Sequence, residues 1–348
     1  MNLNPSLVSP RWWLPRLVVF VLVAASLLVD AEGLLVVPLL FVFVVPFEKL
    51  FPRHRGQKVR RPELGTDLTY AAASPALGVA SVAVAIVVGA VSLAWLPGLA
   101  LRPFVASLPP LAATLLAVLL FDFAVYWVHR WAHEVPALWR FHAVHHSTKT
   151  MDWISGLRNH PLDGAIIAPP FFFLLAAGFD PTLTGALAVI QLISGLFVHA
   201  NVRWRLRPLH RVIITPEFHH WHHANEVDAH SSNYSVFLPL WDILFGTYHM
   251  PRNIRPMRYG VDDPLPNDMI GQLVAPFIGG PTVRMIVSHP VRSAGRGVRW
   301  TRRLLRAIGR STVRPRRRQL AAGEPWRWTA TPPQVPSEPS AEHELVSC

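Results

Sequence analysis

Residues 126–146 read YWVHRWAHEVPALWRFHAVHH and hold two histidine clusters in close succession. A third cluster, HHWHH, occupies residues 219–223. The second and third clusters share the spacing H-x-x-H-H, counted from His142 and from His219. All three lie among segments apolar enough to cross a membrane. The fold must therefore bring many imidazoles together at the edge of an apolar helical bundle.

The composition indicates an integral membrane protein. The chain has 348 residues, of which 51% are hydrophobic and 16% are charged, and its mean hydropathy is +0.30. A soluble domain carries roughly a quarter charged residues. We therefore expect an all-α, multi-pass membrane protein with about four to six spans and a histidine-rich helical cap on the cytosolic side.

The net charge of +12 does not indicate nucleic-acid binding, because the basic residues lie between apolar segments and in the last quarter of the chain. The block at 48–67 is polar and basic, which predicts a cytosolic loop. The single cysteine, Cys348, excludes a disulfide, an iron–sulfur cluster and a cysteine nucleophile. Any metal must be held by histidines and carboxylates.

Six apolar segments form three consecutive pairs: 17–29 with 34–47, 68–96 with 111–128, and 161–179 with 182–199. Each segment of the first pair is shorter than the roughly 20 residues that a span needs. It predicts a tight hairpin with Asp30 and Glu32 near its tip, or one bent or re-entrant segment. An even number of spans between the second and third clusters brings all three to one face of the membrane.

We expect three regions along the chain: an N-terminal hairpin with its basic loop at 1–64, a histidine-rich domain at 65–260, and a basic region at 261–348. Within the last region, the arginines of 284–318 predict either an amphipathic helix on the lipid surface or a basic disordered tail. Residues 320–348 are rich in Pro, Ser, Thr and Glu, which predicts disorder.

The spacing of the histidines predicts metal binding. His129 and His133 are four residues apart and share one helix face, and each H-x-x-H-H cluster places three imidazoles along one stripe. Such stripes suit metal ligation better than core packing. Eight or more imidazoles suffice for two ions, and imidazole suits iron, zinc and copper alike.

Polar residues outside the three clusters predict supporting or packing roles. Asp122 lies inside an apolar span with Tyr126 on the same face, and an intramembrane carboxylate is costly enough to suggest a function. We expect Asp122, with Tyr126, to orient a ligand imidazole, and Asp242 to act similarly. His220 points away from the stripe of His219, His222 and His223, so we expect it to be a surface or packing residue. His210, His230 and His249 lie outside the clusters, so we expect each to interact only with neighbouring residues.

The pattern H-R-x-x-H followed by two H-x-x-H-H clusters resembles the fatty acid hydroxylase/sterol desaturase superfamily. The flanking residues match as well, over about residues 65–250. These flanks are Asp122-x-x-x-Tyr126, Arg158-Asn-His160-Pro161, Phe197-x-His199-Ala-Asn201, Thr215-Pro216, Asn233-Tyr234 and Trp241-Asp242-x-x-Phe245-Gly246-Thr247-Tyr248. One departure is Ser235, where relatives usually have glycine after the tyrosine.

The resemblance implies a hydroxylase or desaturase domain that holds two iron ions, with zinc as the alternative metal. The implied ligands are His129, His133, His142, His145, His146, His219, His222 and His223, with His199 as a ninth and His160 as a further candidate. It implies no catalytic residue beyond these ligands. The chemistry would be O2-dependent oxidation of a C–H bond in a membrane lipid (sterol-like, fatty acyl or isoprenoid), with reduction of oxygen to water.

Electrons would come from NAD(P)H through a ferredoxin or cytochrome b5-like carrier, because the chain has neither a glycine-rich dinucleotide motif nor cysteines for a cluster. The rival functions are a metal transporter and a zinc hydrolase. A transporter would place its ligands along a path through the membrane, and a hydrolase would need fewer ligands and a glutamate base. The sequence leaves the lipid and the choice between hydroxylation and desaturation open.

Overall fold

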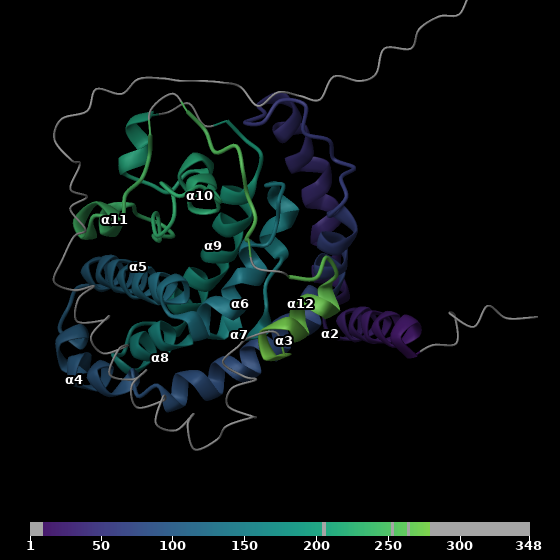
Figure 1. The fold of residues 1–348 in the computed structure, drawn as a ribbon. Helices are drawn as coiled ribbons and strands as arrows, with labels where there is room; N and C mark the ends of the chain where they lie inside the picture. The colour runs from purple at the N-terminus through teal and green to yellow at the C-terminus, as the bar shows by residue number, and fades with distance from the viewer. Residues whose placement is uncertain (1–9, 204–206, 252–253, 263–264, 279–348) are drawn as a thin grey trace, which may run out of the picture.

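The computed structural model describes residues 10–203, 207–251, 254–262 and 265–278 (Figure 1). Within these residues the structure is helical, and the only β pairing consists of isolated bridges such as Pro52 with Val202. The described part is therefore all-α, as predicted. The basic segment 284–318 and the tail 320–348 lie outside the described residues.

The N-terminal helix α2 spans Pro10–Leu50 and breaks at Asp30, where the backbone leaves helical geometry (φ −157°, ψ 74°). The break falls between the two apolar runs predicted from the sequence. In Figure 1 the two halves of α2 diverge from this point instead of lying side by side. The described fold therefore has one bent segment here, which was the alternative to a tight hairpin.

Three helices are long and apolar enough to cross a membrane: α3 (Leu64–Val91), α5 (Pro110–Glu134) and α9 (Pro181–His199). This number refers to the residues that the structure describes. The expected span at 161–179 is divided into two short helices, α7 (Pro161–Ala165) and α8 (Ala168–Ala176). Helix α4 (Trp95–Ala106) links α3 to α5 and contacts α8.

Local sequence fixes where these helices begin. A proline occupies the first turn of α5 and of α9, where its missing N–H costs nothing and its φ suits a helix. The side chain of Asp180 caps α9 by accepting a hydrogen bond from the Thr182 amide (2.6 Å). The buried side chains of Phe121, Leu174 and Leu187 then join α5, α8 and α9 in one apolar cluster.

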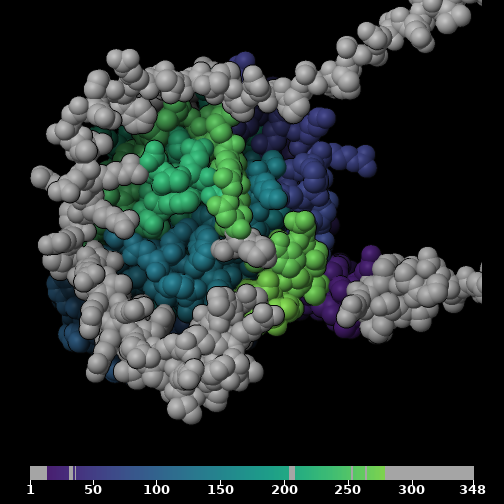
Figure 2. All heavy atoms as spheres, in the orientation of Figure 1, coloured from purple at the N-terminus to yellow at the C-terminus, as the bar shows by residue number. Residues whose placement is uncertain are grey.

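The remaining helices are short and follow the histidine clusters: α6 (Pro136–His146), η1 (Trp153–Leu157), η2 (Arg207–Arg211), α10 (Pro216–His222), α11 (Leu240–Phe245) and α12 (Met269–Ile278). Helix α12, yellow-green in Figure 2, lies on the outside of the body and contacts α6 and α3. The polar cap is thus built from short helices over the ends of the long ones.

Candidate metal centre

Four helices deliver the clustered histidines to one place. The last turns of α5 carry His129 and His133, and α6 carries the second cluster. Helix α9 ends at His199. Helix α10 carries the third cluster, and its capping residue is His223. Because α5 and α9 both end here, the imidazoles collect at one end of two candidate spans.

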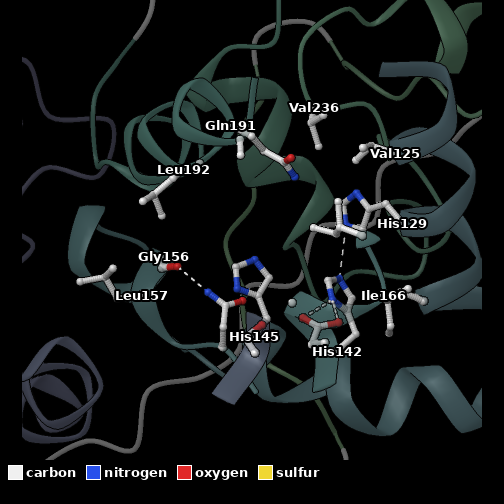
Figure 3. A pocket seen from close by; sticks show the side chains of 18 of the residues that line it. Val125, His129, His142, His145, Gly156, Leu157, Ile166, Gln191, Leu192 and Val236 are labelled. Carbon is white, nitrogen blue, oxygen red and sulfur yellow. Dashed lines mark hydrogen bonds and ion pairs between the residues drawn. The ribbon is translucent and has the colours of Figure 1, made fainter. Parts of the chain in front are cut away.

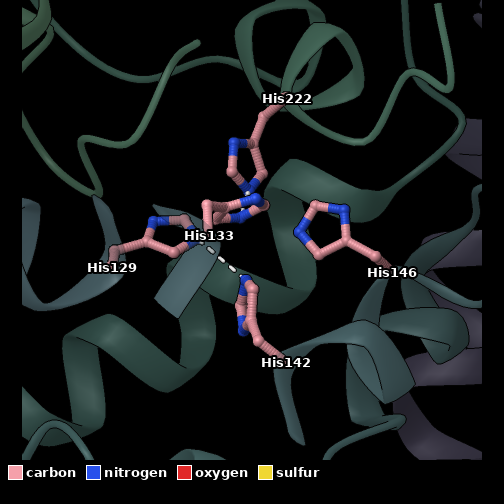
Figure 4. A group of neighbouring side chains, drawn as sticks. All are labelled: His129, His133, His142, His146 and His222. Atoms are coloured by element: carbon pink, nitrogen blue, oxygen red, sulfur yellow. Dashed lines mark hydrogen bonds between the residues drawn. The ribbon is translucent and has the colours of Figure 1, made fainter. Parts of the chain in front are cut away.

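The first group contains five imidazoles: His129, His133, His142, His146 and His222 (Figure 4). One nitrogen of each lies within 4.8 Å of the corresponding nitrogens of the others. The Nε2 atoms of His129 and His142 are 3.2 Å apart, and those of His133 and His222 are also 3.2 Å apart. These ring nitrogens therefore converge on one point.

The second group contains four buried imidazoles: His145, His199, His219 and His223. The Nε2 atom of His199 lies 3.2 Å from those of His145 and His219 and 3.1 Å from that of His223. The rings of His146 and His223 stack across the two groups, with centroids 4.0 Å apart. The nine histidines expected to act together thus lie in two adjacent clusters.

Hydrogen bonds on the far side of the rings select the tautomer. The Nδ1 atom of His129 lies 2.7 Å from the Tyr234 carbonyl oxygen, and that of His199 lies 2.6 Å from the Gly195 carbonyl. In the same way, the Arg158 carbonyl contacts Nδ1 of His145 and the Ser232 carbonyl contacts Nδ1 of His222. A carbonyl can only accept, so Nδ1 carries the proton and Nε2 presents a lone pair to the centre.

The two groups fit metal ions in chemistry as well as in geometry. Burial and neighbouring imidazoles lower the pKa of His146 and His223 well below the ordinary value, which keeps both rings neutral. The buried Nε2 of His146 has no hydrogen-bond partner. Lone pairs that face one another at about 3 Å are unfavourable unless a cation lies between them. Both groups could hold a metal ion.

A cavity of about 560 Å³ adjoins both groups (Figure 3). Its wall includes His129 and His142 from the first group and His145, His199 and His219 from the second. The remaining lining comes mainly from apolar side chains of α3, α5 and α9 and from residues 156–171. A chain of methylenes can therefore lie between the candidate spans and reach the imidazoles.

Comparison with known proteins agrees with this geometry. A family model described as fatty acid hydroxylase matches residues 114–247, which include all nine clustered imidazoles. Residues 114–247 of the chain belong to the fatty acid hydroxylase family. This confirms the family predicted from the order and spacing of the histidines.

Relatives of this chain include several enzymes named for lipid substrates. It is 34% identical over 170 residues to the ornithine lipid hydroxylase OlsE of Rhizobium tropici, covering 47% of this chain and 49% of the relative. It is 31% identical over 144 residues to human alkylglycerol monooxygenase, covering 41% of this chain and 32% of the relative. The chain thus spans about half the length of these relatives or less.

A third relative is the very-long-chain aldehyde decarbonylase GL1-6 of Oryza sativa subsp. indica, 29% identical over 143 residues, which cover 36% of this chain and 21% of the relative. No solved structure matches the chain.

One important contact of the imidazole groups was not predicted from the sequence. The two carboxylate oxygens of Asp163 each lie 3.0 Å from Nδ1 of His142, in place of the carbonyl that holds other rings. Asp163 follows His160-Pro161 in the first turn of α7 and is buried. A carboxylate inside an otherwise apolar segment is the sequence signal that could have revealed it.

Asp122 and Asp242 support the site through the backbone, and neither contacts a clustered imidazole. Asp122 accepts hydrogen bonds from the amides of Phe237 and Leu238 and from the Trp241 indole. Asp242 accepts from the amides of Tyr234 and Ser235. Asp242 therefore fixes the peptide whose carbonyl contacts His129. Asp122 was expected to orient an imidazole directly, but it instead anchors the loop at Phe237 and Leu238.

Tyr126 also acts at a distance from the imidazoles. Its hydroxyl lies 3.0 Å from Oγ1 of Thr247 and accepts a hydrogen bond from Arg130 (3.1 Å). Its ring lies edge-on to the ring of Tyr234. Tyr126 thus joins α5 to the loop that follows α11.

The remaining histidines lie outside both groups. His160 uses both ring nitrogens elsewhere, since Nδ1 accepts from the Leu162 amide and Nε2 lies 3.0 Å from the Leu273 carbonyl. His220 is fully buried against Tyr259 and carbonyls at the end of α9, so it packs and is not exposed. His210 contacts Thr215 and Glu217, and His230 lies 3.3 Å from Asn225.

A buried network of charges supports the second group. Asp67, in the first turn of α3, accepts from Arg158 (2.8 Å) and pairs with Arg61 (2.6 Å). Arg61 also donates to Asp152, the capping residue of η1, at 2.9 Å. The carbonyl of Arg158 holds His145. Two cations and two anions thus fix the backbone that orients this ring.

Proposed function

We propose that this protein is a membrane-bound di-iron oxygenase that hydroxylates a C–H bond of a lipid. The observation that carries the proposal is the pair of imidazole groups in the wall of an apolar cavity between candidate spans. The nine imidazoles together exceed the four ligands that a zinc site uses, so two ions are expected. Two bound iron ions would supply O2 activation and electron transfer to oxygen.

The reaction balances with an external reductant. One lipid C–H group, one O2, two electrons and two protons give one C–OH group and one water. Desaturation consumes the same reagents and gives an alkene and two waters. Relatives named hydroxylase and monooxygenase favour hydroxylation here. The electrons would come from NAD(P)H through a ferredoxin or cytochrome b5-like partner.

The residues of this chain would orient ligands and substrate. The carbonyls of Tyr234, Arg158, Ser232 and Gly195, together with Asp163, would keep Nε2 of five of the nine rings deprotonated and aimed inward. The apolar helices exclude water and hold a lipid chain beside the imidazoles. Exclusion of water favours oxidation of the bound chain over side reactions at the centre.

A lipid substrate is supported by the cavity and by the relatives. Its volume of about 560 Å³ lies in the range of ligand pockets, and its wall is made largely by candidate spans. Relatives named for ornithine lipids and alkylglycerols modify lipids. We propose that the domain at 65–260 binds a membrane lipid chain directly from the bilayer.

The metal end is proposed to face the cytosol. The basic loop after α2 lies at this end, because Arg53 pairs with Glu217 on α10 (3.0 Å) and Arg61 pairs with Asp152. Arg55, Lys58 and Arg60 in the same loop are exposed. Basic loops remain in the cytosol, and an exposed basic surface would also attract an acidic electron carrier.

The test uses the full chain purified in detergent, loaded with iron and supplied with a chemical reductant, isotopically labelled O2 and a total lipid extract. We expect two iron ions per chain and a hydroxylated lipid whose new oxygen derives from O2. His145→Ala should abolish the product, whereas His230→Ala, which alters an exposed ring, should retain it. A single zinc ion with product oxygen derived from water would instead identify a hydrolase.

A further inference from the structure

One of the polar side chains in the cavity wall, that of Gln191, has no role in the proposed chemistry. Gln191 lies on α9, inside a candidate span, and contributes to the cavity wall. Figure 3 shows its amide directed into the same space as His129 and His145. Gln191, Gly195 and His199 are spaced by four residues, so they share one face of α9.

The Gln191 amide is free to bind a ligand. Among the described residues, its side chain makes no hydrogen bond, and its backbone carbonyl accepts from Ser194. By contrast, the Asn159 amide in the same wall already donates to the Gly156 carbonyl. An amide in apolar surroundings is costly unless it is paired. A substrate that offers a matching polar group would remove this cost.

The partner of Gln191 must be uncharged. Apart from the histidines, Asp163 is the one ionisable side chain in the described lining, and it is engaged by His142. The described lining therefore has no lysine or arginine beside Gln191 to pair with a phosphate or carboxylate. A side-chain amide both donates and accepts, so an ether, ester or amide linkage would satisfy it.

The geometry points to Gln191 as a specificity-determining residue that binds a neutral oxygen-bearing linkage of the lipid substrate. This inference rests on the proposed function and narrows its substrate class. Eight residues, a rise of roughly 12 Å along α9, separate Gln191 from His199. The linkage and the oxidised carbon are therefore several bonds apart, and the charged or bulky headgroup lies outside the cavity.

The experiment compares four lipids that differ only at the linkage. They are 1-O-hexadecylglycerol (ether), 1-palmitoylglycerol (ester), 3-palmitamidopropane-1,2-diol (amide) and icosane-1,2-diol, in which a methylene replaces the ether oxygen. Binding to the metal-free full chain in detergent is measured from the shift in unfolding temperature. Turnover and the position of the new hydroxyl are measured on iron-loaded protein.

We expect wild type to bind at least one oxygen-bearing lipid roughly tenfold more tightly than icosane-1,2-diol. Gln191→Leu should bring this ratio to about one, by weakening the oxygen-bearing lipid alone, and should broaden the distribution of hydroxyl positions. Gln191→Asn should restore part of the preference. Ser194→Ala, on the same helix with its hydroxyl already bonded to the backbone, should leave the ratio unchanged.

Two results would overturn the inference: wild type that binds all four lipids equally or binds none, or a Gln191→Leu variant that keeps the wild-type ratio. Loss of the proposed function gives a different result. In that case the lipids bind in a Gln191-dependent order, but the iron-loaded, reduced protein oxidises none of them.

Discussion

Asp163 distinguishes the two imidazole groups at the level of single residues. Its carboxylate contacts Nδ1 of His142, whereas Nδ1 of His129 and of His222 in the same group contacts a backbone carbonyl. A carboxylate makes the imidazole a stronger donor to a metal. The two ions would therefore bind in unlike environments, with the carboxylate-supported ring belonging to the five-histidine group.

Replacing Asp163 should selectively weaken the binding of one metal ion. We expect Asp163→Ala to lower metal affinity in the five-histidine group by roughly 10- to 100-fold, while the four-histidine group keeps its ion. Metal content after titration with a chelator measures this directly. Asp262→Asn, whose side chain is 70% exposed, is the control. Equal loss of both ions would show that Asp163 supports the whole domain instead of one group.

The clustered histidines should make the metal-free protein sensitive to acid. Burial lowers the pKa of His145, His146, His219, His222 and His223 well below the ordinary value. The unfolded chain takes up protons at these rings below about pH 6.5, whereas the folded chain resists them, so stability falls as pH falls through this range.

We therefore expect the unfolding temperature of metal-free protein to be constant above about pH 7.5 and to drop as the pH approaches about 5.5. Thermal unfolding in detergent across this range measures the effect. A profile that is flat down to about pH 5.5 would mean that these rings are not buried as neutral groups in the metal-free fold.

Much of the site at this scale could be predicted from sequence, because helical spacing places side chains on shared faces. The nine histidines predicted together do lie together. Their supports could not be predicted in the same way. The carbonyls of Tyr234 and Arg158 carry no side-chain signal, and their positions depend on loops whose paths the sequence does not specify.

At the scale of secondary-structure elements, the network of Arg61, Asp67, Asp152 and Arg158 connects α3, the basic loop and η1 to the ring of His145. Asp67→Asn would leave the buried guanidinium group of Arg158 without its carboxylate partner. Breaking a buried ion pair costs about 3–5 kcal/mol, so the unfolding temperature should fall clearly.

The same variant should lose metal from the four-histidine group first, because His145 depends on the Arg158 carbonyl. Iron content and unfolding temperature of Asp67→Asn, compared with Asp262→Asn, measure both effects. Lower stability with two ions still bound would show that the network supports the fold without orienting His145.

Hydropathy located the long helices α3, α5 and α9 because uninterrupted apolar runs have one stable form in a membrane. It could not show that the run 161–179 divides. Pro169 and Pro170 lie in the first turn of α8, and a proline in a helix interior removes a backbone hydrogen bond. The apolar composition conceals this break, whereas the bend at Asp30 coincides with a polar residue and was foreseeable.

At the scale of the whole molecule, the proposed orientation can be tested by labelling. Lys58 is exposed in the basic loop at the metal end. In a Cys348→Ser background, Lys58→Cys should react with a membrane-impermeant thiol reagent only when the cytosolic face is accessible. Labelling from the opposite side of intact cells would reverse the assigned topology and separate the site from cytosolic electron carriers.

The shared helices have a consequence for how the centre is assembled. Helix α6 contributes His142 and His146 to one group and His145 to the other, and α10 with its cap is divided in the same way. The first ion to bind would order both helices and raise the affinity of the second site, which is positive cooperativity. In iron titrations, the wild-type chain should therefore give fewer singly loaded molecules than two independent sites would, as native mass spectrometry can show.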